Sequence, residues 1–373
     1  MRNFLGVNCK EAFYFVGRCL GLREDNRATV RKQIEQHQVE WEKVVWVASN
    51  HLVFPALYLK FCQNRLLQFV PGGLAAYLED VYRLNEERNN NILRQVKELN
   101  TLLLQNNISP VFMKGTACLL DGLYAGTGER MIGDIDLLAG DDDFFRAIDV
   151  LKSYGYSNKI PFRSGDISFT KHYPRLVKEG GIAAVEVHRQ PVCTAYTKYF
   201  NFNLVDSCKT ISKGLGAVFV PSDTHKVIQN FIHGQLNDKA QFYGTVSLRN
   251  CYDLHLLEKR GNARLEGIPV PLIKRFNAYH AVKSTVFAEQ VQVSGFYSKV
   301  YCCRLNLNLR YHRWAKSNVV LLYLSGRVAN YMILIYKAFF IKEIRQSLFY
   351  RLKEWNWYRL HFASFKLGLK RFY

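Results

Sequence analysis

Apolar residues recur at intervals of three and four along the first 110 residues of the chain. The stretch Gly73–Leu104 is the clearest example, with charged residues between its apolar positions. This spacing places the apolar side chains on one face of a helix and the charged side chains on the other. We therefore predict that residues 8–110 are helical.

The pattern changes after residue 107 to short apolar runs that end at glycine or at charged residues. Such runs are typical of buried strands, and stretches with helical spacing lie between them. The predicted strands are Pro110–Met113, Ile132–Ala139, Ile167–Tyr173 and Leu176–His188, the last broken by a Gly180–Gly181 turn. The predicted helices are Thr116–Tyr124 and Asp141–Tyr154, which ends at Gly155.

Helical spacing returns at Pro221 and continues to near the end of the chain. The predicted helices include Ser222–His233, which opens with a Ser/Asp cap, Ser247–Leu257 and Pro271–Ala281. This order predicts an α+β fold, in which a mixed α/β core lies between N-terminal and C-terminal helical regions. We expect an N-terminal helical region at 1–107, the α/β core at 108–220, a helical region at 221–300 and a basic, aromatic-rich helical C-terminal region at 301–373.

The charge and the cysteine content restrict the binding partners and the cellular compartment that we expect for this protein. The 373 residues include 51 Lys and Arg against 31 Asp and Glu, a formal +20 that attracts nucleoside triphosphates, nucleic acid or an anionic membrane. The 9 cysteines form no Cys-x-x-Cys pair, which argues against a disulfide framework and a zinc module. The N-terminus lacks the apolar segment of a signal peptide, so we expect a cytoplasmic protein.

Two aspartates alternate with apolar residues in the predicted strand Ile132–Ala139. In a strand, Asp134 and Asp136 project to one side, about 7 Å apart, while Ile135 and Leu137 enter the core. Two partly buried carboxylates repel each other, and Mg²⁺ relieves the repulsion because it prefers one or two carboxylates together with phosphate oxygens. An Asp-x-Asp pair alone fits solvated acids on an edge strand equally well.

Residues on both sides of this pair favour a metal–phosphate site. Lys114-Gly115-Thr116 stands at a predicted strand-to-helix turn, where glycine allows a phosphate to approach closely and lysine adds charge. Arg130 and Gly133 precede the aspartates directly. Downstream, strand alternation places Glu186 and His188 on one face, so Glu186 is a candidate third carboxylate. His188 is either a contact for phosphate or acceptor, or a hydrogen-bond partner of Glu186.

This combination resembles the nucleotidyltransferase superfamily of the DNA polymerase beta type, and most of all its uncharacterised bacterial branch. The shared pattern is a Lys-Gly turn, a Gly-x-Arg-x-x-Gly-Asp-Ile-Asp-Leu-Leu segment and a Glu-x-His strand, here at 114–115, 128–138 and 186–188. A weaker match follows at Ser247–Leu254, and the likeness covers residues 85–260. It implies a mixed sheet of about five strands and the transfer of a nucleoside monophosphate.

The resemblance also implies a role for each matching residue. Asp134 and Asp136 would hold two Mg²⁺ ions, and Glu186 would complete one metal site or act as the general base. The residues implied to contact the NTP donor are Lys114, Gly115, Thr116, Arg130, Gly133 and His188, with Thr116 where many relatives carry serine. If the two strands are neighbours, the Glu186 carboxylate should lie within about 6 Å of one aspartate.

The resemblance does not identify the acceptor, which we expect to be a small molecule, a polysaccharide-pathway intermediate, a peptide or a protein. The alternative is a non-catalytic protein of the same fold that binds nucleotide or nucleic acid. Three clustered acids favour catalysis, because they weaken the binding of a polyanion. On the predicted helix Ser247–Leu257, Arg249 and Asp253 are four residues apart and predict a structural ion pair. The alternative is that Asp253 lies near the acceptor.

The last fifth of the chain is basic and rich in aromatic residues. Residues 301–373 hold 14 Lys and Arg and 2 Asp and Glu, which is +12 of the +20. The apolar run Val319–Ile341 contains Arg327 and Lys337, and a charge at mid-membrane costs about 2.5–3.5 kcal/mol, which disfavours a spanning helix. We predict a packed helix, with peripheral association at an anionic membrane, or with nucleic acid, as the alternative role of this region.

Overall fold

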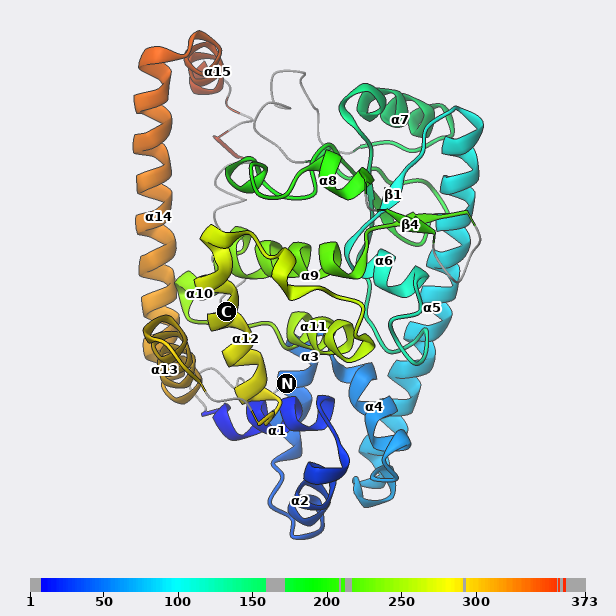
Figure 1. The fold of residues 1–373 in the computed structure, drawn as a ribbon, viewed down its shortest axis with the longest axis vertical. Coiled ribbons are helices and arrows are strands. Elements are labelled where there is room, and N and C mark those ends of the chain that lie inside the picture. Colours follow the sequence, from blue (N-terminus) through cyan, green and yellow to red (C-terminus); the bar gives the residue numbers. More distant parts are fainter. Residues whose placement is uncertain are drawn as a thin grey trace.

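The computed structural model describes residues 8–158, 172–207, 209–211, 217–290 and 293–353, together with Trp355, Tyr358 and Arg359. A small mixed sheet lies among helices, which confirms the predicted α+β fold. Two long helices mark opposite sides of the molecule, α5 (Gly72–Gln105) and α14 (His312–Phe340), and the sheet and most other helices lie between them (Figure 1).

Five helices precede the sheet, as the periodicity predicts. They are α1 (Lys10–Leu20), α2 (Glu24–Glu35), α3 (Trp41–Asn50), α4 (Phe54–Gln63) and α5. The apolar positions Leu78, Ile92, Val96 and Leu99 of α5 are all buried. The stripe that predicts this helix is therefore the face that packs on the core.

The sheet has five short strands in the order β3-β2-β1-β5-β4. Their bounds are β1 (Val111–Phe112), β2 (Asp134–Leu138), β3 (Ala184–His188), β4 (Thr210–Ile211) and β5 (Phe219–Val220). β2 runs antiparallel to β1 and parallel to β3. Ile135 and Leu137 are fully buried, so β2 turns its apolar face to the core and leaves its aspartates on the other face.

The helices that follow β1 and β2 agree with the sequence pattern. α6 (Lys114–Leu120) follows β1, and α7 (Asp141–Ser153) follows β2. α7 is followed by Gly155, whose φ of +86° is a conformation that favours glycine.

The predicted strand Ile167–Tyr173 lies outside the described residues except for its last two. There the His172 backbone forms an antiparallel bridge with His188 of β3. The predicted strand Leu176–His188 divides as expected at the glycine turn: Leu176 forms an isolated bridge with Val185, and β3 resumes at Ala184.

Helices make up most of the described chain from residue 202 onward. They are α8 (Phe202–Ser207), which lies between β3 and β4, then α9 (Asp223–Phe231), α10 (Ala240–Tyr243), α11 (Leu248–Arg260), α12 (Ile273–Val286), α13 (Phe296–Arg310), α14 and α15 (Lys342–Lys353). The predicted cap of α9 is present, because the Ser222 side chain accepts a hydrogen bond from the His225 N–H.

The first and last helical regions share one core. A Cβ atom on Gly17 of α1 would lie 2.4 Å from the Val286 carbonyl oxygen at the end of α12, so glycine permits this close approach. The Tyr14 hydroxyl donates to Asn306 Oδ1 of α13 at 3.1 Å. Helices almost 300 residues apart in sequence therefore support each other.

The packed helix predicted for 319–341 forms, but only its first turns are packed. Ala315 and Val319 of α14 are buried, whereas most side chains from Val328 onward are exposed. By length and composition, 313–340 is the one candidate for a membrane-crossing helix among the described residues. The sequence pattern predicts the helix correctly, but it does not reveal that the rest of the chain leaves most of it uncovered.

We predict that His51 makes folding stability depend on pH. Its Nδ1 atom accepts a hydrogen bond from the Leu248 N–H of α11, and burial lowers the pKa of His51 to about 4. The unfolded chain binds this proton near pH 6.5, so stability falls as the pH drops from about 6.5 towards 4. In His51→Asn, which keeps a hydrogen-bond acceptor, the free energy of unfolding should fall by about 1–2 kcal/mol less between pH 7 and pH 5 than in the wild type. Urea unfolding at the two pH values measures this difference. Parallel pH profiles for the two proteins would contradict this assignment.

Candidate active site

The side chains of Asp136, Glu186 and His188 converge where β2 and β3 lie side by side. The parallel register pairs Asp136 with Glu186 and Leu138 with His188. His188 Nε2 lies 2.8 Å from Asp136 Oδ1 and 3.4 Å from Glu186 Oε2. One ligand atom from each residue lies within 4.8 Å of the other two, and all three residues are buried. The expectation that Glu186 approaches an aspartate is confirmed.

The Lys114 ammonium supplies positive charge directly to this cluster. Its Nζ atom lies 2.5 Å from Asp136 Oδ1 and 3.8 Å from Glu186 Oε2. Lys114 has a φ of +54°, an unfavourable backbone conformation for a residue with a side chain. Such strain is concentrated at functional sites, where the surrounding structure holds it in place.

Asp134 stands beside the cluster and is joined to it through Arg175. Arg175 donates from Nη2 to Asp134 Oδ2 and from Nε to Glu186 Oε1, both at 2.8 Å. Nothing in the sequence pattern singled out Arg175. Leu176 forms an antiparallel bridge with Val185, and this pairing places Arg175 next to Glu186. Knowledge of this strand register would have identified Arg175 as a site residue.

The two buried carboxylates have pKa values below their ordinary range. Burial acts to raise the pKa of Asp136, but the Lys114 ammonium and His188 outweigh it. Burial likewise acts to raise the pKa of Glu186, and hydrogen bonds from His188 and Arg175 hold it far lower. The pKa of Asp134, by contrast, is raised, mainly by burial, against the opposing charge of Arg175.

The donor set of the cluster fits a divalent cation. Two carboxylates with low pKa values are ionised at neutral pH, and carboxylate oxygens are the ligands that Mg²⁺ prefers. An imidazole nitrogen is the third available donor and suits several divalent metals. The Lys114 ammonium lies close to both carboxylates, as expected for a cation beside two clustered negative charges.

Arg130 is directed away from the cluster, into a buried ion pair. Its guanidinium donates to both carboxylate oxygens of Asp253 on α11, at 2.9–3.2 Å, and the Tyr124 hydroxyl donates to the same carboxylate at 2.9 Å. The predicted Arg249–Asp253 pair is therefore wrong. Asp253 pairs instead with Arg130, which is distant in sequence, because the buried Arg130 guanidinium requires a bidentate acceptor.

Helix α5 holds the loop that leads into β2. Asn85 Nδ2 donates to the Gly128 and Arg130 carbonyls at 2.7 and 3.1 Å, and Asn89 Nδ2 donates to the Thr127 and Arg130 carbonyls at 2.6 and 2.7 Å. A Cβ on Gly128 would lie 2.8 Å from the Tyr82 carbonyl oxygen of α5. Gly128 and the Arg130 backbone therefore have a structural role.

The other predicted phosphate-binding residues lie near Lys114. A Cβ on Gly115 would make only ordinary contacts, 3.6–3.7 Å, with Ile132 and the Arg130 guanidinium. The buried Thr116 hydroxyl donates to the Asp134 carbonyl at 3.3 Å. Gly133 has open space where a side chain would be. A side chain at position 115 or 133 would therefore fit sterically, so close packing is not the reason for glycine at these positions.

A family model described as an uncharacterised nucleotidyltransferase matches residues 37–268, more than half of the chain. The chain belongs to this nucleotidyltransferase family. The match spans the cluster, Lys114 and the Arg130–Asp253 pair, and it extends beyond the residues 85–260 expected from the sequence. No curated protein and no solved structure matches the chain.

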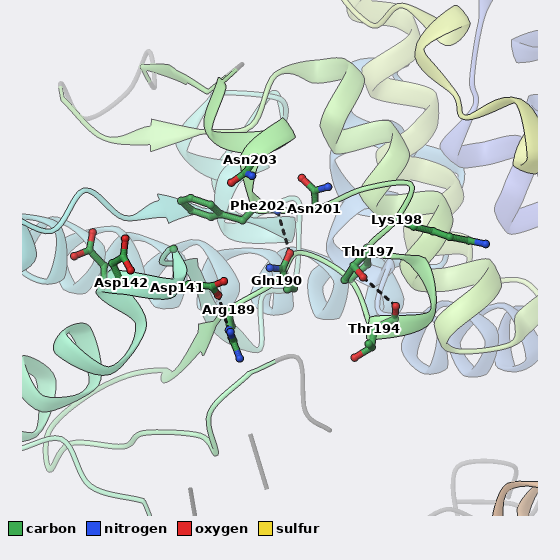
Figure 2. A pocket seen from close by; sticks show the side chains of 13 residues that line it. Asp141, Asp142, Arg189, Gln190, Thr194, Thr197, Lys198, Asn201, Phe202 and Asn203 are labelled. Atoms are coloured by element: carbon green, nitrogen blue, oxygen red, sulfur yellow. Dashed lines mark hydrogen bonds and ion pairs between the residues drawn. The ribbon is translucent and has the colours of Figure 1, made fainter. Parts of the chain in front are cut away.

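A separate pocket of about 690 Å³ begins one residue beyond His188 (Figure 2). Its wall contains the Asp141–Arg189 ion pair, whose closest atoms lie 2.5 Å apart. Gln190 Oε1 accepts a hydrogen bond from the Phe202 N–H at 3.0 Å, and the Phe202 ring packs on Gly140. The clustered carboxylates do not line this pocket, whose lining starts directly after the last residue of β3.

We predict that Lys114→Gln destabilises the fold by roughly 2 kcal/mol at neutral pH, because it leaves the buried Asp136 carboxylate without its nearest cation. Adding Asp136→Asn should restore most of the loss, measured as a double-mutant cycle by urea unfolding. The pKa of Asp136 is lowered in the folded state, so the contribution of Lys114 should decline as the pH falls below about 4. Equal stability of Lys114→Gln and wild type would contradict this role.

Proposed function

We propose that the protein transfers a nucleoside monophosphate from an NTP to an acceptor in a Mg²⁺-dependent reaction of the DNA polymerase beta type. The observation that carries the proposal is the buried cluster of Asp136, Glu186 and His188 beside Lys114. Membership of a nucleotidyltransferase family supports the reaction class.

In this reaction the acceptor's nucleophilic atom forms a bond to the α-phosphorus of the NTP. The bond from that phosphorus to the bridging oxygen breaks, pyrophosphate leaves, and the acceptor gives up a proton. Lys114 would contact the phosphates of the donor, and Gly115 leaves room for them beside it. The Arg130 guanidinium lies 3.7 Å from where a Cβ atom on Gly115 would be, and its ion pair with Asp253 fixes the loop on that side.

Asp136 and Glu186 would hold the cation, with His188 orienting both carboxylates through Nε2. A bound Mg²⁺ would neutralise charge on the triphosphate and lower the pKa of the acceptor's nucleophilic group. The depressed pKa of Glu186 makes it a weak base, so we assign it to metal binding. Asp134 has a raised pKa and stands at the edge of the cluster, which makes it the better proton acceptor.

The non-catalytic alternative is less favoured by the chemistry of the cluster. A site that only binds a polyanion has no use for two buried, ionised carboxylates, which repel phosphate. Burying them is also costly without a function for their charge.

We place the acceptor in the pocket beside β3. The pocket starts at Arg189, directly after the last residue of β3, and the charged and amide side chains that line it suit a small polar molecule.

We predict that Asp136→Asn and Glu186→Gln each lower transfer by at least about a hundredfold without unfolding the protein, because each removes a charged metal ligand. The assay incubates the protein with each α-³²P-labelled NTP, Mg²⁺ and a cell extract, and detects labelled product. Asp149→Asn, which changes an exposed acid on the neighbouring helix α7, is the matched control and should be as active as wild type. Full transfer by either cluster variant would exclude the cluster as the metal site.

We predict that Thr194→Trp, which fills the pocket, abolishes labelled product and leaves Mg²⁺-dependent NTP binding intact. Equilibrium dialysis with labelled NTP separates these two readouts. Normal transfer by this variant would place the acceptor elsewhere and leave the assignment of the cluster unaffected.

A further inference from the structure

Helix α14 carries an apolar stripe on the face turned away from the rest of the protein. We call this set the outer stripe; it consists of Trp314, Leu321, Leu324, Val328, Met332, Ile335 and Phe339. Between Leu321 and Phe339 its members are spaced by three or four residues, and Ser317 occupies the same face after Trp314. Their exposed fractions run from 36% to 73%, and the stripe extends about 38 Å along the helix.

The opposite face of α14 explains this orientation. Ala315 and Val319, four residues apart, are buried, and α14 packs there against α13. Gly326 faces the Lys239 ammonium, which lies 3.7 Å from where a Cβ atom would be. The first turns of α14 therefore face the body, and the helix lies along one side of the molecule (Figure 1). The outer stripe is on the opposite face and is exposed.

The second half of α14 is apolar and exposed on more than one face. Besides the outer stripe, Ile333 and Phe340 are 52% and 73% exposed. A groove on a partner protein would cover a single face of a helix. The boundary between lipid headgroups and acyl chains can surround the sides of the helix as well.

Positive charge accompanies the outer stripe. Residues 290–342 contain eight Lys and Arg and no Asp or Glu. Arg313, Lys316 and Arg327 follow one edge of the stripe, since intervals of three and eleven residues return to nearly the same side of a helix. The Arg327 guanidinium lies over the rings of Tyr323 and Tyr331, 5.9 and 5.6 Å from their centroids.

We propose that α14 docks the protein in the plane of an anionic membrane surface, with the outer stripe in the headgroup–acyl boundary and the flanking cations on the headgroups. Exposed apolar residues, one cationic edge and interfacial Trp and Tyr rings together fit such a surface. Two copies of so basic a helix would repel each other, and nucleic acid would not require the Val, Met, Ile and Phe side chains. Arg327 at the middle of the helix opposes a spanning orientation.

The test is co-sedimentation of the full chain with vesicles of phosphatidylcholine, alone or with about 30% phosphatidylserine. We expect strong binding only to the anionic vesicles, and weaker binding when NaCl rises from about 0.05 M to about 0.5 M. Val328→Gln with Met332→Gln should lower the partition coefficient by about tenfold or more, because two apolar side chains no longer enter the boundary. Arg313→Gln with Lys316→Gln should lower binding to the anionic vesicles selectively.

The matched control pair is Leu84→Gln with Val270→Gln, which changes two exposed apolar residues outside α14 and should bind like wild type. Circular dichroism checks that every variant is folded. Wild-type binding by the Val328/Met332 pair would overturn the proposal. A dimer that depends on the outer stripe, seen by sedimentation velocity in a protein that does not bind vesicles, would also overturn it. Vesicle binding that does not change with salt concentration or lipid charge would do the same. Loss of vesicle binding with normal nucleotide transfer would support it and leave the proposed function untouched.

Discussion

The carboxylate of Asp136 is buried, and the surrounding structure is arranged to keep it charged. A buried carboxylate without a cation would take up a proton or destabilise the fold. Lys114 and His188 prevent this by approaching the same oxygen, Asp136 Oδ1, at 2.5 and 2.8 Å. Lys114 adopts a positive φ in doing so, which means that part of the free energy of folding is used to hold the charge in place. A divalent cation and an NTP would meet a site whose charges are already positioned.

Further buried ion pairs hold the elements that carry this site. Arg130 and Asp253 connect the loop before β2 to α11. Lys226 of α9 lies 2.6 Å from Asp121 and 3.0 Å from Asp223, and Arg260 of α11 also reaches Asp121, at 2.6 Å. These pairs fix the end of α6 and the positions of α9 and α11. Breaking one would leave an uncompensated buried charge, so this charge network favours a single arrangement of the sheet and the helices.

The motif at 114–115, 128–138 and 186–188 therefore combines two kinds of residue. Asp136, Glu186 and Lys114 form the charged cluster. Gly128 and Arg130 position the strand that carries it, Gly128 by allowing α5 to approach and Arg130 by pairing with Asp253. Residues of both kinds are needed because an ionised, buried site requires a rigid support.

The class of fold, most of the helices and the faces of the strands could be predicted from the order of residues alone. Alternation in β2 and β3 depends on backbone geometry alone, so it correctly placed Ile135 and Leu137 in the core and brought Glu186 to the face of Asp136. Which charges pair depends on how distant parts of the chain pack together. The i,i+4 rule proposed Arg249 for Asp253, but burial of Arg130 gave that carboxylate a stronger partner from another element. Arg175 joins Asp134 to Glu186 only because the chain folds back beside β3. Likewise, the pattern of 319–341 predicts a helix. It cannot reveal that other elements cover only the first turns of α14, because this depends on contacts between distant parts of the chain.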